Sequence, residues 1–174
     1  AGYGFAEAGI DYNTAELSEQ TLRDVVFPPF KAAVDAGVST FMTAFNDIGG
    51  IPCTKNKDLF TIILRDEWGF DGFVVSDWNS IGELVVHGAA ENKKEAAFLA
   101  LDAGVDMDME GRCYRNHLLS LFEQGLVTEE MINKSVERIL KIKYRLGLFE
   151  DPYRYSSIQR ETDGVYNEGN LAVS

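Results

Sequence analysis

The segment 72–80, Gly-Phe-Val-Val-Ser-Asp-Trp-Asn-Ser, contains the residues best suited to chemistry. Its apolar run ends in Asp77, and an apolar run of strand length that ends in an acid is typical of a buried parallel strand whose last residue faces a site. A buried carboxylate costs free energy unless it is hydrogen-bonded or paired, so Asp77 either caps a helix or pairs with an arginine, or it reacts with a substrate. Trp78 favours the second interpretation because aromatic rings stack on sugars, although a tryptophan beside a loop also serves as packing.

Two other apolar runs also end in polar residues. The run 38–46 is followed by Asp47, and the run 105–109 carries Asp106 and Asp108 and precedes Glu110. Strand alternation places both aspartates on one face, where we expect Asp106 to be the buried structural partner of an arginine. Glu110 is either a site acid or a solvated loop acid.

Three further side chains have a plain structural interpretation. Met42 and Phe45 lie near the end of the first run, and core packing is the stronger expectation for both from spacing alone. His87 is expected to be a loop residue.

Helical periodicity fills the stretches between these runs. We predict helices over 19–26, 30–36, 57–68, 92–103, 114–124 and 129–146, and strands over 38–46, 72–77 and 105–109. Ser18 is a suitable N-cap for the first helix, and Gly104 closes the fourth. Alternation of strands and helices predicts a parallel sheet with right-handed crossovers.

Both a doubly wound sheet and part of a barrel are compatible with this pattern. The acids at the carboxyl ends of the strands favour a barrel, where functional residues gather on that face, and no glycine-rich phosphate loop follows any strand. We therefore predict an α/β fold in which residues 1–150 are the C-terminal part, about three β/α units, of a (β/α)8 TIM-type barrel. Residues 151–174 lack periodicity and are predicted to be a linker.

Composition narrows the classes of partner. The 174 residues include 16 basic and 28 acidic side chains, a net charge of −12, which argues against nucleic acid and anionic membranes and is compatible with a neutral substrate such as a sugar. Cys53 and Cys113 are expected to be free thiols, and neither a metal nor a cofactor is expected. No apolar run is long enough to predict membrane insertion. The start at Ala1-Gly2, without an initiator methionine, leads us to expect a piece of a longer protein.

Several segments, in order, resemble glycoside hydrolase family 3. Residues 73–78 resemble the family's nucleophile signature, and residues 42–50 are similar to its Met-x-x-Tyr-Asn-x-x-x-Gly stretch on the preceding strand. Residues 105–109 resemble its last barrel strand, residues 138–153 the segment that closes its first domain, and residues 3–22 the region after its Lys-His substrate-binding pair. The nearest subgroup is the bacterial periplasmic-type β-glucosidases.

The resemblance implies a retaining β-glucosidase that releases terminal non-reducing β-D-glucose from glucosides or β-linked gluco-oligosaccharides. Asp77 would be the catalytic nucleophile and form a covalent glycosyl-enzyme, while Trp78, Met42 and Phe45 would line the sugar subsite. In retaining glycosidases a second carboxyl, about 5–5.5 Å away, protonates the leaving oxygen. The same resemblance implies a periplasmic or secreted protein.

The sequence differs from the family pattern at one position and in two functional groups that it does not contain. Phe45 stands where many members have tyrosine, which does not by itself imply loss of activity. The Lys-His pair would precede this segment, and the acid/base glutamate would belong to a second α/β domain that follows it. The chain alone is therefore expected to be inactive. The alternatives are a non-catalytic carbohydrate-binding or scaffold module, or a family 3 β-xylosidase.

Overall fold

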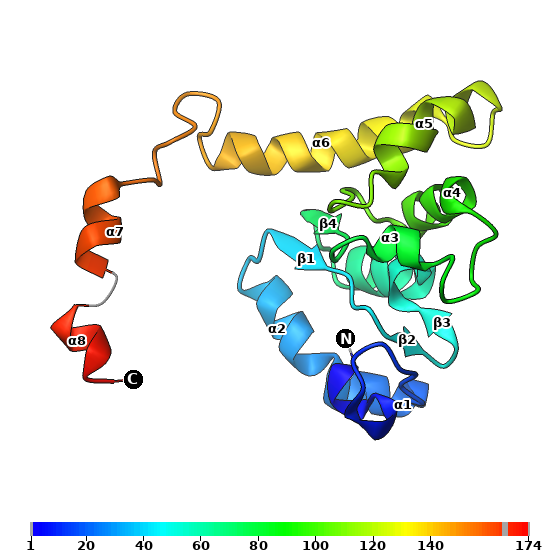
Figure 1. The fold of residues 1–174 in the computed structure, drawn as a ribbon, viewed down its shortest axis with the longest axis horizontal. Coiled ribbons are helices and arrows are strands. Elements are labelled where there is room, and N and C mark those ends of the chain that lie inside the picture. Colours follow the sequence, from blue (N-terminus) through cyan, green and yellow to red (C-terminus); the bar gives the residue numbers. More distant parts are fainter. Residues whose placement is uncertain (1, 165–166, 174) are drawn as a thin grey trace. The chain divides into compact units, whose positions relative to one another are not determined.

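The computed structural model describes residues 2–164 and 167–173. It contains two compact units, Ala1–Ile139 and Leu140–Ser174. Every candidate site residue lies in the first unit (Figure 1).

Short strands and longer helices make up the first unit. The strands are β1 (Thr40–Met42), β2 (Asp47–Ile48), β3 (Ile51–Pro52) and β4 (Phe73–Val75). The helices are α1 (Glu19–Thr21), η3 (Leu22–Val26), α2 (Pro28–Asp35), η5 (Asp58–Glu67), α3 (Ser80–Glu83), α4 (Lys93–Ala103), α5 (Cys113–Glu123) and α6 (Glu129–Arg145), of which η3 and η5 are wound as π-helices. Single 3-10 turns occupy η1 (Tyr3–Phe5), η2 (Glu7–Gly9) and η4 (Cys53–Lys55). In the second unit, α7 (Ile158–Gly164) and α8 (Glu168–Leu171) follow the end of α6.

The central strands are parallel, as predicted. β1 pairs with β4 in a register that sets Met42 opposite Val75, and Val75 forms a parallel bridge with Met107 on its other side. Backbone hydrogen bonds continue this second pairing, with Ser76 N–H donating to the Met107 carbonyl at 2.8 Å. Gly72 opens β4 because a Cβ there would lie 2.1 Å from the Ser39 carbonyl oxygen.

One face of these strands is covered by helices. Val74 is fully buried in a core that also contains Phe60 and Leu64 of η5, Ile81 and Leu84 around α3, and small side chains of α4. Alanines 96, 97 and 100 let α4 approach closely.

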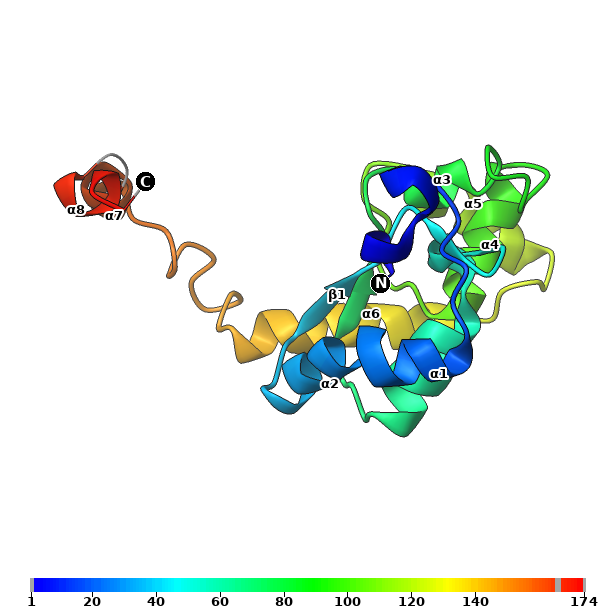
Figure 2. The ribbon, with the colours of Figure 1, turned by 90° about the horizontal axis from the view of Figure 1, so that it is seen from below.

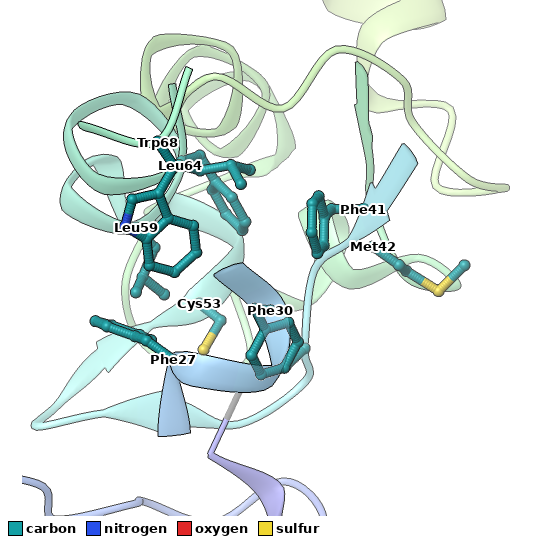
Figure 3. Close-up of a pocket in the computed structure, with 10 residues that line it drawn as sticks. Phe27, Phe30, Phe41, Met42, Cys53, Leu59, Leu64 and Trp68 are labelled. Carbon is teal, nitrogen blue, oxygen red and sulfur yellow. The ribbon is translucent and has the colours of Figure 1, made fainter. Parts of the chain in front are cut away.

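Alternation along β1 separates this helical layer from the opposite face. Phe41 points into an apolar pocket between α2, β1 and η5 that is also lined by Phe27, Phe30, Leu59 and Trp68, whereas Met42 points to the other side of the strand (Figure 3). None of the side chains that line this pocket is charged, and Asp77 is not among them.

A buried ion pair ties the strands to the helices. Asp106 accepts hydrogen bonds from Arg65 of η5 at 2.6 Å, from Arg138 of α6 at 2.8 Å and from the Val74 N–H at 2.8 Å. Burial lowers the pKa of Arg65, and the neighbouring Asp106 carboxylate counteracts that effect. This confirms the expectation that Asp106 is a structural partner of arginine.

The structure differs from the predictions mainly in the lengths of strands. The run 38–46 is a strand only over Thr40–Met42, because the chain then turns into the β2–β3 hairpin, where Gly49 and Gly50 both have positive φ. The predicted strand 105–109 is reduced to the single bridge at Met107. The helix α3 and the two short helices α7 and α8 were not predicted; positions 165–166 and 174 of the predicted linker lie outside the described residues.

Candidate active site

Asp77 lies two residues beyond the end of β4, at the carboxyl edge of the parallel strands. Its side chain is half-buried, and its Oδ1 accepts a hydrogen bond from the Trp78 N–H at 2.6 Å. Its backbone carbonyl accepts the Ser80 N–H at 3.1 Å, which starts the turn into α3. The carboxylate is thus held by its own loop, and no arginine or lysine pairs with it among the described residues.

A buried cluster of three hydroxyls fixes the backbone beneath Asp77. The Asp77 N–H donates to Thr43 Oγ1 at 3.1 Å, and that oxygen also lies 3.1 Å from both Thr54 Oγ1 and Ser80 Oγ. All three hydroxyl side chains are buried. They join the segments after β1, β3 and β4, so the position of Asp77 depends on three separate parts of the chain.

Ser76 also holds the loop that carries Asp77. Its fully buried hydroxyl donates to the Asp77 carbonyl at 2.9 Å and accepts the Met109 N–H at 2.8 Å. The backbone at Asp77 is therefore held by hydrogen bonds that involve Thr43 on one side and the Ser76–Met109 contact on the other.

Aromatic side chains from the N-terminal segment surround this edge. The Phe45 N–H donates to the Tyr3 hydroxyl oxygen at 2.8 Å, and the Tyr12 ring stacks on Phe45 with centroids 4.7 Å apart and on His87 at 6.4 Å. The contact between Tyr12 and His87 brings part of this N-terminal segment to the loop that follows α3. Tyr12 and Tyr3 are 46% and 42% exposed.

The negative charge of Asp77 contributes to the raised pKa values of two of these aromatic residues, Tyr3 and Tyr12. Burial raises the pKa of Tyr3, the hydrogen bond from Phe45 counteracts it, and Asp11 and Asp77 add to the rise. Burial raises the pKa of Tyr12, with further contributions from Glu83, Asp11 and Asp77. Both phenols therefore stay protonated at neutral pH and can donate hydrogen bonds.

The predicted subsite residues do not all gather at one point. Trp78 is 61% exposed next to Asp77, and Met42 is 49% exposed on the face of β1 opposite the helical layer. Phe45 is half-buried under Tyr12. Their assignment to a sugar subsite remains a prediction.

The acids on either side of Met107 do not all join the site. Asp106 is used in the ion pair, and Asp108 Oδ2 accepts the Tyr114 N–H at 3.1 Å at the start of α5. Glu110 is exposed in a left-handed turn with φ 61°. Its position resembles that of a solvated loop acid.

Sequence reasoning missed Tyr3, Tyr12 and Thr43. The contact between Tyr3 and Phe45 spans 42 positions, and the contact between Thr43 and Ser80 spans 37. Neither contact can therefore be predicted from a local sequence pattern. Within the described part of the chain, no group of three or more potential ligands could hold a metal ion. No helix in those residues is long and apolar enough to cross a membrane.

The geometry defines an α/β protein with a carboxylate and aromatic rings at the carboxyl ends of its parallel strands. Comparison with known proteins refines this class. The family described as "Glycosyl hydrolase family 3 N terminal domain" matches residues 1–142. The chain therefore belongs to glycosyl hydrolase family 3.

Individual relatives agree with this assignment. The periplasmic beta-glucosidase of Salmonella typhimurium is 42% identical over 165 residues, which cover 95% of this chain and 21% of that protein. A beta-xylosidase of Formosa agariphila is 44% identical over 158 residues, covering 86% of this chain and 22% of that protein. The crystal structure of a beta-glucosidase from Listeria innocua has a TM-score of 0.91 at 42% identity and covers 98% of this chain and 24% of that one. The chain thus spans less than a quarter of the length of each.

Proposed function

We propose that this chain is part of a retaining β-glycosidase in which Asp77 is the catalytic nucleophile. The observation that carries the proposal is a half-buried, unpaired carboxylate whose backbone is fixed by hydroxyls at the carboxyl edge of parallel strands, in a chain of family 3. Functional residues of (β/α)8 barrels gather on that edge. The aromatic rings beside Asp77 suit a sugar ring.

The proposed reaction has two steps. A carboxylate oxygen of Asp77 attacks the anomeric carbon as the bond to the leaving oxygen breaks, and a second carboxyl donates a proton to that oxygen. Water, deprotonated by the same second group, then cleaves the ester and frees Asp77. Because Oδ1 is held by the Trp78 N–H, we expect Oδ2 to be the attacking atom.

The second carboxyl is proposed to come from a second domain outside this chain. The relatives are four to five times longer than the segment they share with it, which leaves room for such a domain and for the rest of the barrel. We infer that residues 1–150 are the C-terminal part of that barrel and that residues 151–174 lead to the second domain. The isolated chain is accordingly proposed to be inactive.

The substrate class is proposed to be β-glucosides, acted on outside the cytoplasm. Support comes from the relative named periplasmic beta-glucosidase and from structures of the Listeria innocua beta-glucosidase with glucose and with laminaribiose. A second candidate, β-xylosides, is favoured by the two Formosa agariphila relatives named as beta-xylosidases, at 40% and 44% identity.

Substitution of the nucleophile tests the proposal. In the full-length protein, Asp77→Asn should reduce kcat for nitrophenyl β-glucoside and β-xyloside by at least about a thousandfold, because the amide cannot form the ester. Glu110→Gln is the matched control and should retain activity, since Glu110 is an exposed acid on the same edge. Full activity of Asp77→Asn would refute the assignment.

A further inference from the structure

The backbone N–H of Phe45 is held by a side chain rather than by a neighbouring strand. Thr43, the residue after β1, still takes part in the parallel pairing, because its N–H donates to the Val75 carbonyl at 3.0 Å. Two residues later, the Phe45 N–H donates to the Tyr3 hydroxyl oxygen at 2.8 Å. The phenol of Tyr3 therefore supplies the hydrogen-bond acceptor at the point where the chain leaves the parallel strands.

The N-terminal segment of residues 2–15, dark blue in Figure 2, is attached to the chain after β1 at both of its ends. At one end is the contact of Tyr3 with Phe45. At the other end, Ala15 forms a parallel bridge with Ile48, and the Ala15 N–H donates to a backbone carbonyl of the β2–β3 hairpin at 3.0 Å. The place of the Tyr3 hydroxyl is thus fixed by the fold.

The stretch of chain that Tyr3 holds also carries the group that positions Asp77. The Thr43 hydroxyl accepts the Asp77 N–H at 3.1 Å and belongs to the buried cluster of three hydroxyls. Thr43 lies only two residues before Phe45, and the rigid peptide units between them transmit a shift of one to the other. Two hydrogen bonds and this short piece of backbone therefore connect Tyr3 to the backbone of Asp77.

Two further observations separate the hydroxyl of Tyr3 from its ring. The ring belongs to neither hydrophobic core cluster, and the side chain is exposed, so the contact that the fold uses is the one made by the hydroxyl. The charge of Asp77 contributes to the raised pKa of Tyr3, which places the phenol within electrostatic range of that carboxylate.

We propose that Tyr3 is a positioning residue for the reaction at Asp77. Its hydroxyl fixes the backbone of Phe45, which keeps Thr43 in place as the acceptor for the Asp77 N–H. Tyr3 acts through these residues and does not touch the reacting atoms. This inference rests on the proposed glycosidase function, because its effect is measured on turnover.

Removal of the hydroxyl alone tests the inference. In the full-length protein, Tyr3→Phe keeps the ring but removes the acceptor, so we expect kcat for nitrophenyl β-glucoside or β-xyloside to fall at least about threefold. KM should stay within about twofold, because no contact with substrate is lost. Tyr114→Phe is the matched control, since that hydroxyl donates to the Val105 carbonyl at 2.7 Å, and this variant should retain kcat.

A double-mutant cycle tests the connection through Thr43. In a Thr43→Val protein the contact with the Asp77 N–H is already lost, so adding Tyr3→Phe should lower kcat by less than about twofold further. The same fold-loss from Tyr3→Phe in both backgrounds would show that Tyr3 does not act through Thr43, and would overturn the inference.

Two other outcomes would also overturn it. An unchanged kcat in folded Tyr3→Phe would mean that the hydroxyl serves the fold alone, and a raised KM with unchanged kcat would mean that it binds substrate directly. Thermal unfolding of each variant, followed by circular dichroism, shows that the kinetic values refer to folded protein. A wild-type protein that hydrolyses neither β-glucosides nor β-xylosides would refute the proposed function itself, and this inference with it.

Discussion

At the scale of residues, the candidate site is a carboxylate on a rigid backbone. Asp77 is positioned by hydrogen bonds of its N–H and carbonyl to Thr43, Ser76 and Ser80 rather than by a charged partner. This suits a nucleophile, because a paired cation would compete for the oxygen that must attack. Rigidity matters because small displacements of the reacting groups lower the reaction rate strongly.

Removal of the Thr43 hydroxyl tests this positioning. Thr43→Val leaves the partly buried Asp77 N–H without its acceptor, so we expect kcat to fall about tenfold and the free energy of unfolding to fall by about 1–3 kcal/mol. Thr61→Val is the matched control, because its hydroxyl donates to the Ala103 carbonyl at 3.0 Å away from the site. It should lose stability without loss of kcat; equal kcat losses would contradict the role of Thr43.

The two cysteines give a prediction about pH. Burial raises the pKa of Cys53 and of Cys113 from the ordinary value of 9.0 to about 11, so the folded state holds these protons more tightly than the unfolded chain. Their contribution to stability is full below pH 9 and is lost as the pH rises through 11. We expect negligible alkylation by iodoacetamide at pH near 8 until urea is added; rapid labelling of the native protein would contradict this.

At the scale of elements, the Asp106 ion pair holds the sheet and helices together. Its carboxylate joins β4 to η5 and α6, and the side chain is completely buried. A buried ion pair contributes little net stability, yet removal of one partner leaves the other charge buried and unpaired.

Neutralising Asp106 should therefore destabilise the fold strongly. Asp106→Asn is expected to lower the free energy of unfolding by about 3–5 kcal/mol in urea titrations of the full-length protein. Asp102→Asn breaks the exposed pair with Lys57 and should cost less than about 1 kcal/mol. Similar losses for the two variants would show that the buried ion pair contributes no more to the free energy of unfolding than the exposed one.

Most helices could be predicted from the sequence because caps and apolar periodicity are local. Ser18 caps the first helix by accepting the Thr21 N–H, and Asn92 caps α4 in the same way. The strand lengths were less accurate, since pairing partners rather than propensity decide where a strand ends. Thr43, for example, lies one residue beyond β1, where its N–H still donates to the Val75 carbonyl at 3.0 Å while its hydroxyl accepts the Asp77 N–H.

The candidate site could be predicted only in part for the same reason. Asp77 was identified because it ends an apolar run. Tyr3 and Tyr12 carry no such signal, because the tertiary contacts that bring them to Phe45 and His87 join a glycine-rich N-terminal segment to distant parts of the chain.

At the scale of the whole molecule, the parallel sheet consists of β1 and β4 among the described residues. β1 pairs with β4 on one side only among the described residues, and Met42 is exposed on the face away from the helices. An open strand edge with apolar neighbours is a pairing surface. This agrees with the proposal that further barrel strands in the full-length protein adjoin β1 and cover that face.

Chemical trapping of the intermediate tests the central claim most directly. Full-length protein treated with a 2-deoxy-2-fluoro glycoside should gain the mass of one sugar, because the fluorine slows hydrolysis of the ester on the nucleophile. Peptide mapping should place that mass on the peptide that contains Asp77, and Asp77→Ala should remain unlabelled. A label on another acid, or full activity of the Asp77→Ala protein, would contradict the account.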